Sequence, residues 1–244
     1  MTRPIILLDD GGVMNDNQLR GEQWPLLVSE FFSPRLGGTR TAWAEANRVV
    51  IQRILESASW EQRLLAYADY TSFERGYWLD WLGGMTRHVG VPLPDDDECV
   101  ELARQAEGFV IPQVRSAYPG ASATIRQLRT EGYILHTASN GSSLHLAGYL
   151  EGMGVRDCFG RLYGADLLNA FKDGPDYYSR LFVNLQIEPG AAVIVDDSPR
   201  ALARASELGA RTVLVGVAQA TGRGTLHIGS LTELPALLQK KAYF

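Results

Sequence analysis

Four short apolar runs recur along the chain, and each has the length of a strand buried on both faces. They occupy residues 5–8, 133–138, 191–195 and 212–215. The last three follow helical stretches at 121–130, 176–185 and 199–208. Strands that alternate with helices indicate right-handed βαβ units, so the pattern predicts an α/β fold with a parallel sheet. A weak strand at 226–228 and a helix at 231–239 complete the predicted elements.

The alternation is interrupted after the first run by a segment rich in Trp, Arg, Glu and Ala. Helical spacing appears in it at 42–56 and 60–67, and the acidic run at 95–98 is expected to cap a further helix. No buried-strand run occurs there. We therefore predict a mainly helical insertion at residues 17–114, with a core built from 1–16 and 115–244. Most of the tryptophans, all of which lie in the insertion, are expected to pack its interior.

Composition narrows the class of protein. The chain has 244 residues, of which 45% are hydrophobic and 21% charged, and a net charge of −5 without a basic run. Such a chain can bury a full core, and we expect no nucleic-acid partner. The N-terminal apolar run is too short for a signal peptide, and no run reaches membrane-spanning length. Cys99 and Cys158 are far apart and form no metal-type pair, which favours reduced thiols and a cytoplasmic location.

One lysine stands out against the use of basic residues elsewhere. Lys172 is the only lysine before Lys240, although arginines are frequent throughout the chain. A compact ammonium and a planar guanidinium have different geometries, so a lone interior lysine is a candidate for a site that needs the former. An ordinary surface lysine is the alternative interpretation.

Polar residues follow three of the apolar runs, where a parallel sheet of this kind binds its ligands. Asp9, Asp10, Gly11 and Gly12 follow the first run, Ser139 and Asn140 the second, and Asp196 and Asp197 the third. With Lys172, these residues offer carboxylates, a hydroxyl, backbone amides and an ammonium. Such a set can hold a divalent cation and a phosphate together, and its hard oxygen ligands suit Mg²⁺.

The order of these segments resembles the four motifs of the haloacid dehalogenase superfamily, most of whose members are phosphatases. The segments are LLDDGGVMND, HTASNG, FKDGPDYY and VIVDDSPRALARASELGA. The first resembles the Asp-x-Gly-Gly-Val variant of the family's nucleophile motif. The resemblance implies a Rossmann-like three-layer core, a helical cap at the insertion and a small phosphorylated metabolite as substrate. It leaves the oligomeric state open between monomer and homodimer.

The resemblance also implies a role for each motif residue. Asp9 is the expected nucleophile and a Mg²⁺ ligand, with the carbonyl of Gly11 and the carboxylate of Asp197 as further ligands. Asp196 is expected to assist at the metal or to orient Lys172. The phosphoryl group is expected to be held by the Ser139 hydroxyl, by Lys172 and by backbone amides near Gly11, Gly12 and Asn140. If Asp10 instead filled the family's second acidic position, Leu8 would stand at the nucleophile position and the enzyme would be inactive.

The family's second aspartate, which normally protonates the leaving oxygen, is replaced by Gly11. Loss of such a general acid is expected to cost about 10²–10⁴-fold in rate for a poor leaving group. A substrate with a good leaving group, a proton donor from the cap, or Asp10 after a local twist could compensate. We expect Asp10 to point away from Asp9, because successive strand side chains face opposite sides.

Three other functions are weighed against a phosphatase. A phosphonate-cleaving enzyme needs a cap lysine, and the insertion contains none. A haloacid dehalogenase needs no metal and has no evident use for Asp196 and Asp197, but it shares the missing second aspartate. A protein that binds phosphate and hydrolyses little is the remaining alternative. His136, inside a predicted strand, is expected to be a core histidine rather than a base.

Overall fold

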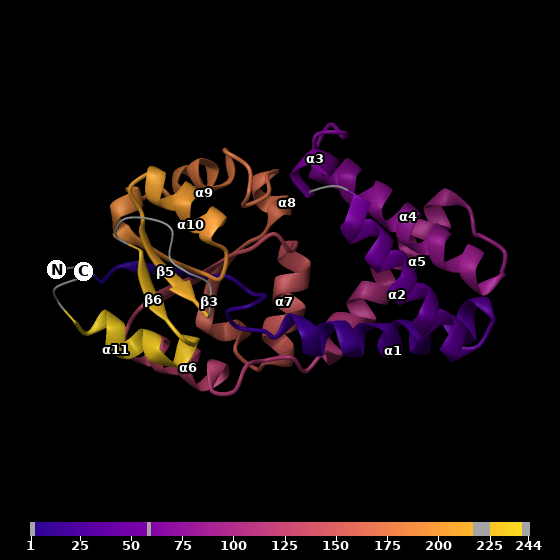
Figure 1. Ribbon diagram of the computed structural model, residues 1–244, viewed down its shortest axis with the longest axis horizontal. Coiled ribbons are helices and arrows are strands. Elements are labelled where there is room, and N and C mark those ends of the chain that lie inside the picture. Colours follow the sequence, from indigo (N-terminus) through magenta and orange to yellow (C-terminus); the bar gives the residue numbers. More distant parts are fainter. Residues whose placement is uncertain (1–2, 58–59, 217–224, 241–244) are drawn as a thin grey trace. The chain divides into compact units, whose positions relative to one another are not determined.

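The computed structural model describes residues 3–57, 60–216 and 225–240, and divides the chain into two compact units (Figure 1). The first unit comprises Met1–Asn17 and Ser116–Phe244, and the second comprises Gln18–Arg115. The second unit therefore interrupts the first in sequence.

A six-stranded parallel sheet forms the centre of the first unit. The strands are β1 (Ile5–Leu8), β2 (Ile134–Ala138), β3 (Phe159–Tyr163), β4 (Ala192–Asp196), β5 (Arg211–Val215) and β6 (Leu226–Ile228). Their order in the sheet is β3-β2-β1-β4-β5-β6. β1 lies in the middle, where Leu8 is in register with Thr137 of β2 and Val195 of β4. The carboxyl ends of the three strands therefore meet at one edge.

Helices cover both faces of this sheet, as Figure 1 shows. On one face Ile6 and Leu8 pack with residues of α6 (Ala121–Thr130), α7 (Ser143–Gly152) and α11 (Leu234–Leu238). On the other face Leu7 and Ile194 pack with α9 (Tyr177–Leu185) and α10 (Pro199–Glu207). Alternate residues of one strand thus enter different cores, which explains why β1 and residues 192–195 of β4 are apolar throughout. This is the α/β, Rossmann-like arrangement predicted from the sequence.

The main departure from the predicted elements is β3, which the apolar pattern did not indicate. β3 is the edge strand beside β2, and Gly160 and Arg161 within it are exposed. An edge strand needs no continuous apolar run, so its signal was absent. The C-terminal helix also differs, because a 3₁₀ turn, η4 (Leu231–Glu233), precedes α11. Further short elements of this unit are η2 (Arg156–Cys158), α8 (Ala165–Leu168) and η3 (Pro189–Ala191).

All described elements of the second unit are helical. They are α1 (Asn17–Leu36), α2 (Arg40–Ser57), α3 (Trp60–Leu64), α4 (Tyr70–Val89), α5 (Asp96–Val110) and η1 (Ile111–Gln113). Trp43 and Trp81 are fully buried, and Trp43 stacks on Phe32 at a ring separation of 5.0 Å. The side chain of Trp60 lies outside the described residues. Asp95 caps α5 by accepting a hydrogen bond from the Glu98 amide, which matches the role expected for the acidic run.

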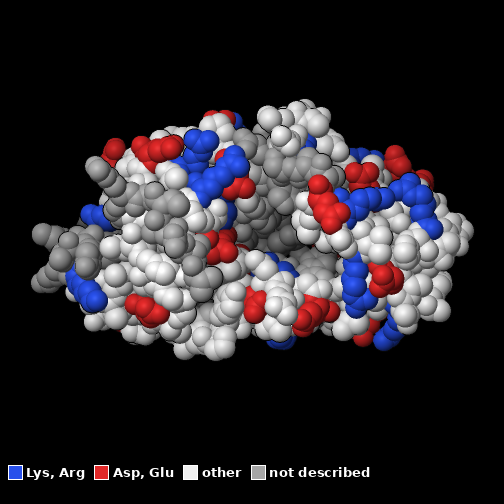
Figure 2. Space-filling model, viewed as in Figure 1, with Lys and Arg blue, Asp and Glu red and all other residues white. Residues whose placement is uncertain are grey.

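Other features of the described residues bear on the class of protein. Cys99 and Cys158 are both buried and unpaired. No helix in the described residues is both long and apolar enough to cross a membrane. On the face shown in Figure 2, basic and acidic side chains are interspersed over both units.

His136 in β2 should make the first unit less stable in acid. Its side chain is buried, its Nδ1 accepts a hydrogen bond from the Arg161 amide at 2.8 Å, and burial lowers its pKa below the ordinary value of 6.5. The unfolded chain therefore binds a proton at His136 more readily than the folded protein does. The contribution of neutral His136 to the free energy of unfolding is complete above about pH 6.5 and is lost as the pH falls through the folded-state pKa. Urea unfolding across this range should show a smaller acid loss for His136→Gln than for the wild type. An equal loss of stability in acid for the two proteins would show that His136 is not its cause.

Candidate functional site

The carboxyl edge of the sheet brings together residues that are far apart in the sequence. Asp9 directly follows β1, and its amide donates to the Val195 carbonyl of β4 at 2.9 Å. Ser139 follows β2 and its amide donates to the Tyr163 carbonyl of β3 at 3.0 Å. Asp196 is the last residue of β4. The strand ladder therefore continues into the first residue after β1 and β2, which fixes the backbone from which Asp9 and Ser139 project.

Lys172 is the charged centre of this group. Its Nζ lies 2.8 Å from Asp9 Oδ1 and 2.7 Å from Asp196 Oδ2. Lys172 is only 4% exposed, and Asp196 is fully buried. Removing one partner of a buried pair leaves an uncompensated charge and costs about 3–5 kcal/mol. The lone interior lysine is thus an integral part of the core and not a surface residue.

The loop that carries Lys172 is held by the segment after β2. The Lys172 amide donates to Asn140 Oδ1 at 2.6 Å. Asn140, expected to contribute a backbone amide, therefore also uses its side chain to position Lys172. Ser139 is buried, and its Oγ accepts a hydrogen bond from the Gly141 amide at 3.3 Å. Because Oγ acts as the acceptor in that bond, the hydroxyl proton is left for a ligand.

The charges in this site are unevenly balanced. Burial raises the pKa of Asp9 to about 7, Lys172 opposes the rise, and Asp196 adds to it. Burial also raises the pKa of Asp196 and, together with the nearby Asp9, that of Asp197. Burial alone would lower the pKa of Lys172, but Asp196 and Asp9 outweigh it and keep the pKa well above its usual value. One ammonium thus faces three carboxylates, and the surplus negative charge favours a bound cation.

The residues present fit a divalent metal ion. Oxygen atoms of Asp9, Asp196 and Asp197 all lie within 4.8 Å of one another. Carboxylate oxygens are the ligands that Mg²⁺ prefers. Asp196 also accepts two hydrogen bonds, one at Oδ2 from Lys172 Nζ and one at Oδ1 from the Ser198 amide at 2.9 Å. Its geometry therefore suits both of the roles considered for it, a metal ligand and a support for Lys172.

The turn after β1 passes close against the Asp197 carboxylate. Gly12 has a φ of +82°, and a Cβ added there would collide with the Asp197 carboxylate. Only glycine suits this position, because the left-handed conformation and the lack of space act together. The turn itself closes through the Met14 and Asn15 amides, which both donate to the Asp10 carbonyl at 2.9 Å.

Asp10 lies beside Asp9 in sequence but is used differently. Its Oδ1 accepts a hydrogen bond from Asn15 Nδ2 at 2.7 Å, and Asn15 Oδ1 accepts one from Ser116 Oγ at 3.0 Å. Asp10 is thereby engaged in holding the turn, while Asp9 faces Lys172. This arrangement supports the register in which Asp9, and not Leu8, stands at the nucleophile position.

A family model of haloacid dehalogenase-like hydrolases matches residues 21–209. The chain belongs to this family. A phosphoglycolate phosphatase of Rhodospirillum rubrum is 32% identical over 100 residues, which are 41% of this chain and 42% of that protein. The (S)-2-haloacid dehalogenase 4A of Burkholderia cepacia is 29% identical over 100 residues, 41% of this chain and 43% of that protein. The matches thus span less than half of either relative.

Solved structures of this family share the fold over nearly the whole chain. L-2-haloacid dehalogenase from Xanthobacter autotrophicus matches with a TM-score of 0.65 and 19% identity, covering 98% of this chain and 99% of that one. A magnesium-bound putative hydrolase, YfnB from Bacillus subtilis, matches with a TM-score of 0.62 and 16% identity over 98% and 100% of the chains. At these identities the likeness shows the fold alone. Both metal-binding and dehalogenase-named proteins share it.

Two tyrosines of the FKDGPDYY segment, to which the sequence assigned no role, complete this haloacid dehalogenase-like site. The Tyr177 hydroxyl donates to the Tyr163 carbonyl at 3.0 Å and lies 3.3 Å from the Ser139 carbonyl. The Tyr178 hydroxyl is buried without a hydrogen-bond partner in the described residues, and burial and the Asp196 charge raise its pKa. Both follow Lys172 closely in sequence, but an aromatic pair at the start of a helix gave no signal distinct from core packing.

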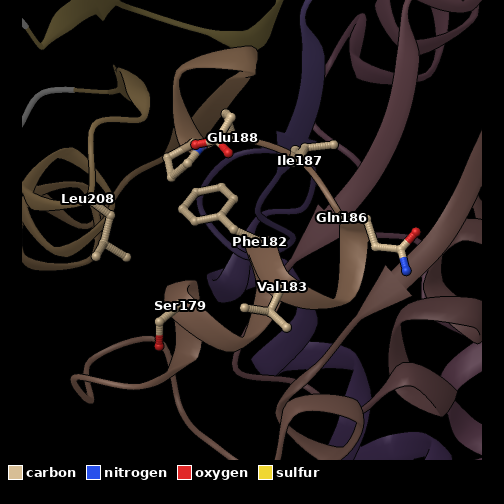
Figure 3. Close-up of a pocket in the computed structure, with 8 residues that line it drawn as sticks. Ser179, Phe182, Val183, Gln186, Ile187, Glu188 and Leu208 are labelled. Carbon is tan, nitrogen blue, oxygen red and sulfur yellow. The ribbon is translucent and has the colours of Figure 1, made fainter.

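A separate pocket of the family core lies away from these charges (Figure 3). Its lining comes from α9, from η3 and the segment between them, and from Leu208 after α10, with Phe182, Val183 and Leu208 among the apolar residues. Glu188 is its only ionisable residue. The pocket adjoins η3, which precedes β4, so it lies toward the amino end of the strand. It lacks the clustered charges of the carboxyl edge and is not a candidate catalytic site.

Replacing Gly12 by Ala should destabilise the first unit by more than the backbone strain alone would cost. A left-handed conformation costs a non-glycine residue about 1–2 kcal/mol, and the added methyl group must also displace Asp197. Gly132→Ala is a matched control, because Gly132 has a φ of +84° in the same unit and an added Cβ meets nothing within 4 Å. Urea unfolding should give Gly12→Ala a clearly lower free energy of unfolding than Gly132→Ala. Equal stabilities would show that the Asp197 contact imposes no constraint.

Replacing Lys172 by Arg should lower stability although the charge is kept. A guanidinium is larger than an ammonium, and overpacking a buried site costs about 1–3 kcal/mol. Lys240→Arg, at an exposed position, should leave the free energy of unfolding unchanged. Thermal and urea unfolding of the two variants provide the measurement. A Lys172→Arg protein as stable as the wild type would remove the requirement for a compact cation.

Proposed function

We propose that the chain is a Mg²⁺-dependent phosphatase of a small phosphorylated metabolite, acting through an aspartyl-phosphate intermediate on Asp9. The observation that carries the proposal is the convergence of Asp9, Asp196 and Asp197 around a single buried ammonium. Three carboxylates with one cationic partner are suited to bind a divalent ion. A metal-independent dehalogenase has no evident use for that surplus of charge.

The proposed chemistry begins with the Asp9 carboxylate. An Asp9 oxygen attacks phosphorus, the bond from phosphorus to the leaving oxygen breaks, and an acyl phosphate forms. Water then attacks that phosphorus, which releases inorganic phosphate and restores the carboxylate. Lys172 and the Ser139 hydroxyl hold the phosphoryl oxygens as negative charge shifts between them. A Mg²⁺ held by Asp9, Asp197 and Asp196, with the Gly11 carbonyl, would add positive charge beside those oxygens.

The buried Asp9 carboxyl must be ionised to act as a nucleophile. Its pKa is raised to about 7 by burial and by the neighbouring acids. Lys172, at 2.8 Å, already favours the charged form. A divalent cation would favour it further, because opposite charges within a few ångströms lower the pKa of a carboxyl group. Metal and nucleophile thus support each other in this proposal.

A metal-independent haloacid dehalogenase is the second candidate. The absence of an acid at Gly11 favours it, since a departing halide needs no proton. In that reaction Asp9 would displace halide from carbon and form an ester, which water would hydrolyse. The similarity to a phosphatase and to a dehalogenase leaves both chemistries open. A weakly active phosphate-binding protein is the third candidate. We retain a small-molecule substrate and a cytoplasmic location as part of the proposal.

Release of inorganic phosphate and of halide distinguishes the candidates. We expect phosphate release from a panel of phosphate esters and acyl phosphates, dependent on Mg²⁺ and abolished by chelator. Asp9→Asn should lose this activity while its urea unfolding curve stays cooperative, because the amide cannot act as the nucleophile. Halide release from 2-haloacids that persists in chelator would favour the dehalogenase. Phosphate binding without turnover would favour the third candidate, and full activity of Asp9→Asn would exclude Asp9 as nucleophile.

A further inference from the structure

The position of the missing general acid is occupied by another side chain. Gly11 has no side chain, and a Cβ added to it would lie 2.5 Å from Asn17 Oδ1 and 2.9 Å from Asn17 Nδ2. Both distances are shorter than real Cβ contacts. The space that a side chain at position 11 would enter is therefore taken by the carboxamide of Asn17, which is six positions later in the sequence.

The turn after β1 explains how Asn17 reaches this position. Gly12 turns the chain with its positive φ, and its amide donates to the Asn15 carbonyl at 2.8 Å. Gly11 and Asn15 are also paired by an isolated bridge. The closed turn returns the chain alongside Gly11, and Asn17 is the first residue of α1. A glycine at position 11 is what leaves room for it.

Asn17 is also available for a ligand. It is exposed, and its side chain makes no hydrogen bond within the part of the chain that the structure describes. Asp10, which was considered as a replacement for the missing general acid, already accepts a hydrogen bond from Asn15. An unengaged carboxamide next to the nucleophile loop offers two N–H donors and one acceptor oxygen.

We propose that Asn17 contacts the substrate and donates a hydrogen bond to the leaving-group oxygen in the space left by Gly11. This role rests on the phosphatase proposed above. A carboxamide transfers no proton at neutral pH, so the leaving oxygen takes its proton from water after the bond to phosphorus breaks. Asn17 stabilises the negative charge that develops on that oxygen. Because it cannot neutralise the charge, the substrates preferred are those whose leaving groups are already stable anions.

The test compares Asn17→Ala with the wild type on phosphate compounds whose leaving groups differ in basicity. An alkyl phosphate, an aryl phosphate and acetyl phosphate provide the series. We expect Asn17→Ala to lower kcat/KM by about 10-fold or more for the alkyl phosphate, as for a lost hydrogen bond to a charged group. The loss should shrink toward acetyl phosphate, where little charge needs support. The matched control is Gln18→Ala, which removes the exposed side-chain carboxamide next to Asn17 in α1. It should leave kcat/KM unchanged.

A second variant tests whether the Gly11 space and Asn17 act together. The methyl group of Gly11→Ala must push the Asn17 carboxamide aside, so this variant should reproduce the leaving-group-dependent loss. The double variant Gly11→Ala, Asn17→Ala should lose no more than either single variant, since both remove the same contact. Circular dichroism and urea unfolding of each variant check that the fold is kept.

The outcomes separate this role from the proposed function. If the wild type releases phosphate but Asn17→Ala matches it on every substrate, the role of Asn17 is wrong and the phosphatase stands. A loss that is equal for all leaving groups, or single losses that multiply in the double variant, would also overturn the role. If the wild type releases no phosphate from any substrate, the phosphatase itself is wrong and the role of Asn17 falls with it.

Discussion

The ammonium of Lys172 between Asp9 and Asp196 is the interaction on which the arrangement of charges at the carboxyl edge of the sheet depends. It joins the ends of β1 and β4 to the loop before α9, and every partner is buried. Its cost in desolvation is large, so it is better explained by the site than by stability. Without it, three carboxylates would crowd one another with no compensating charge. With it, Asp9 stays close to the acids that a cation would share.

Support for this cluster comes from polar contacts that reach back into the sheet. Asn140 accepts a hydrogen bond from the backbone amide of Lys172, Tyr177 contacts the carbonyls at the ends of β2 and β3, and Asn15 donates to Asp10 within the turn. None of these side chains needs to touch a substrate. Each instead holds a segment that carries or adjoins a residue of the proposed mechanism. The positions at the strand ends are thus fixed from several directions before any ligand binds, which is the preorganisation that catalysis by electrostatics requires.

Some of this arrangement was predictable from the sequence, and the rest was not. The apolar runs that become β1, β2, β4 and β5 indicated the parallel sheet, and the polar residues after β1, β2 and β4 indicated the edge where the candidate site lies. Those signals are local, because a strand buried on both faces must be apolar throughout. β3 escaped notice because an edge strand tolerates Gly160 and Arg161. The roles of Asn15, Asn17 and Tyr178 depend on how the chain folds back in space, and no short-range pattern encodes a contact of that kind.

The central place of β1 has a consequence for how the protein folds. Ile5 pairs with Ile134 on one side and with Ala192 on the other, so β1 must wait for partners that lie more than 120 residues later in the chain. Closing such long loops is slow, because their entropy is lost before the strand contacts form. The helices of residues 18–115 need only local contacts and can form early. Until those strand contacts form, β1 is an unpaired apolar strand, and exposed strands of this kind favour aggregation.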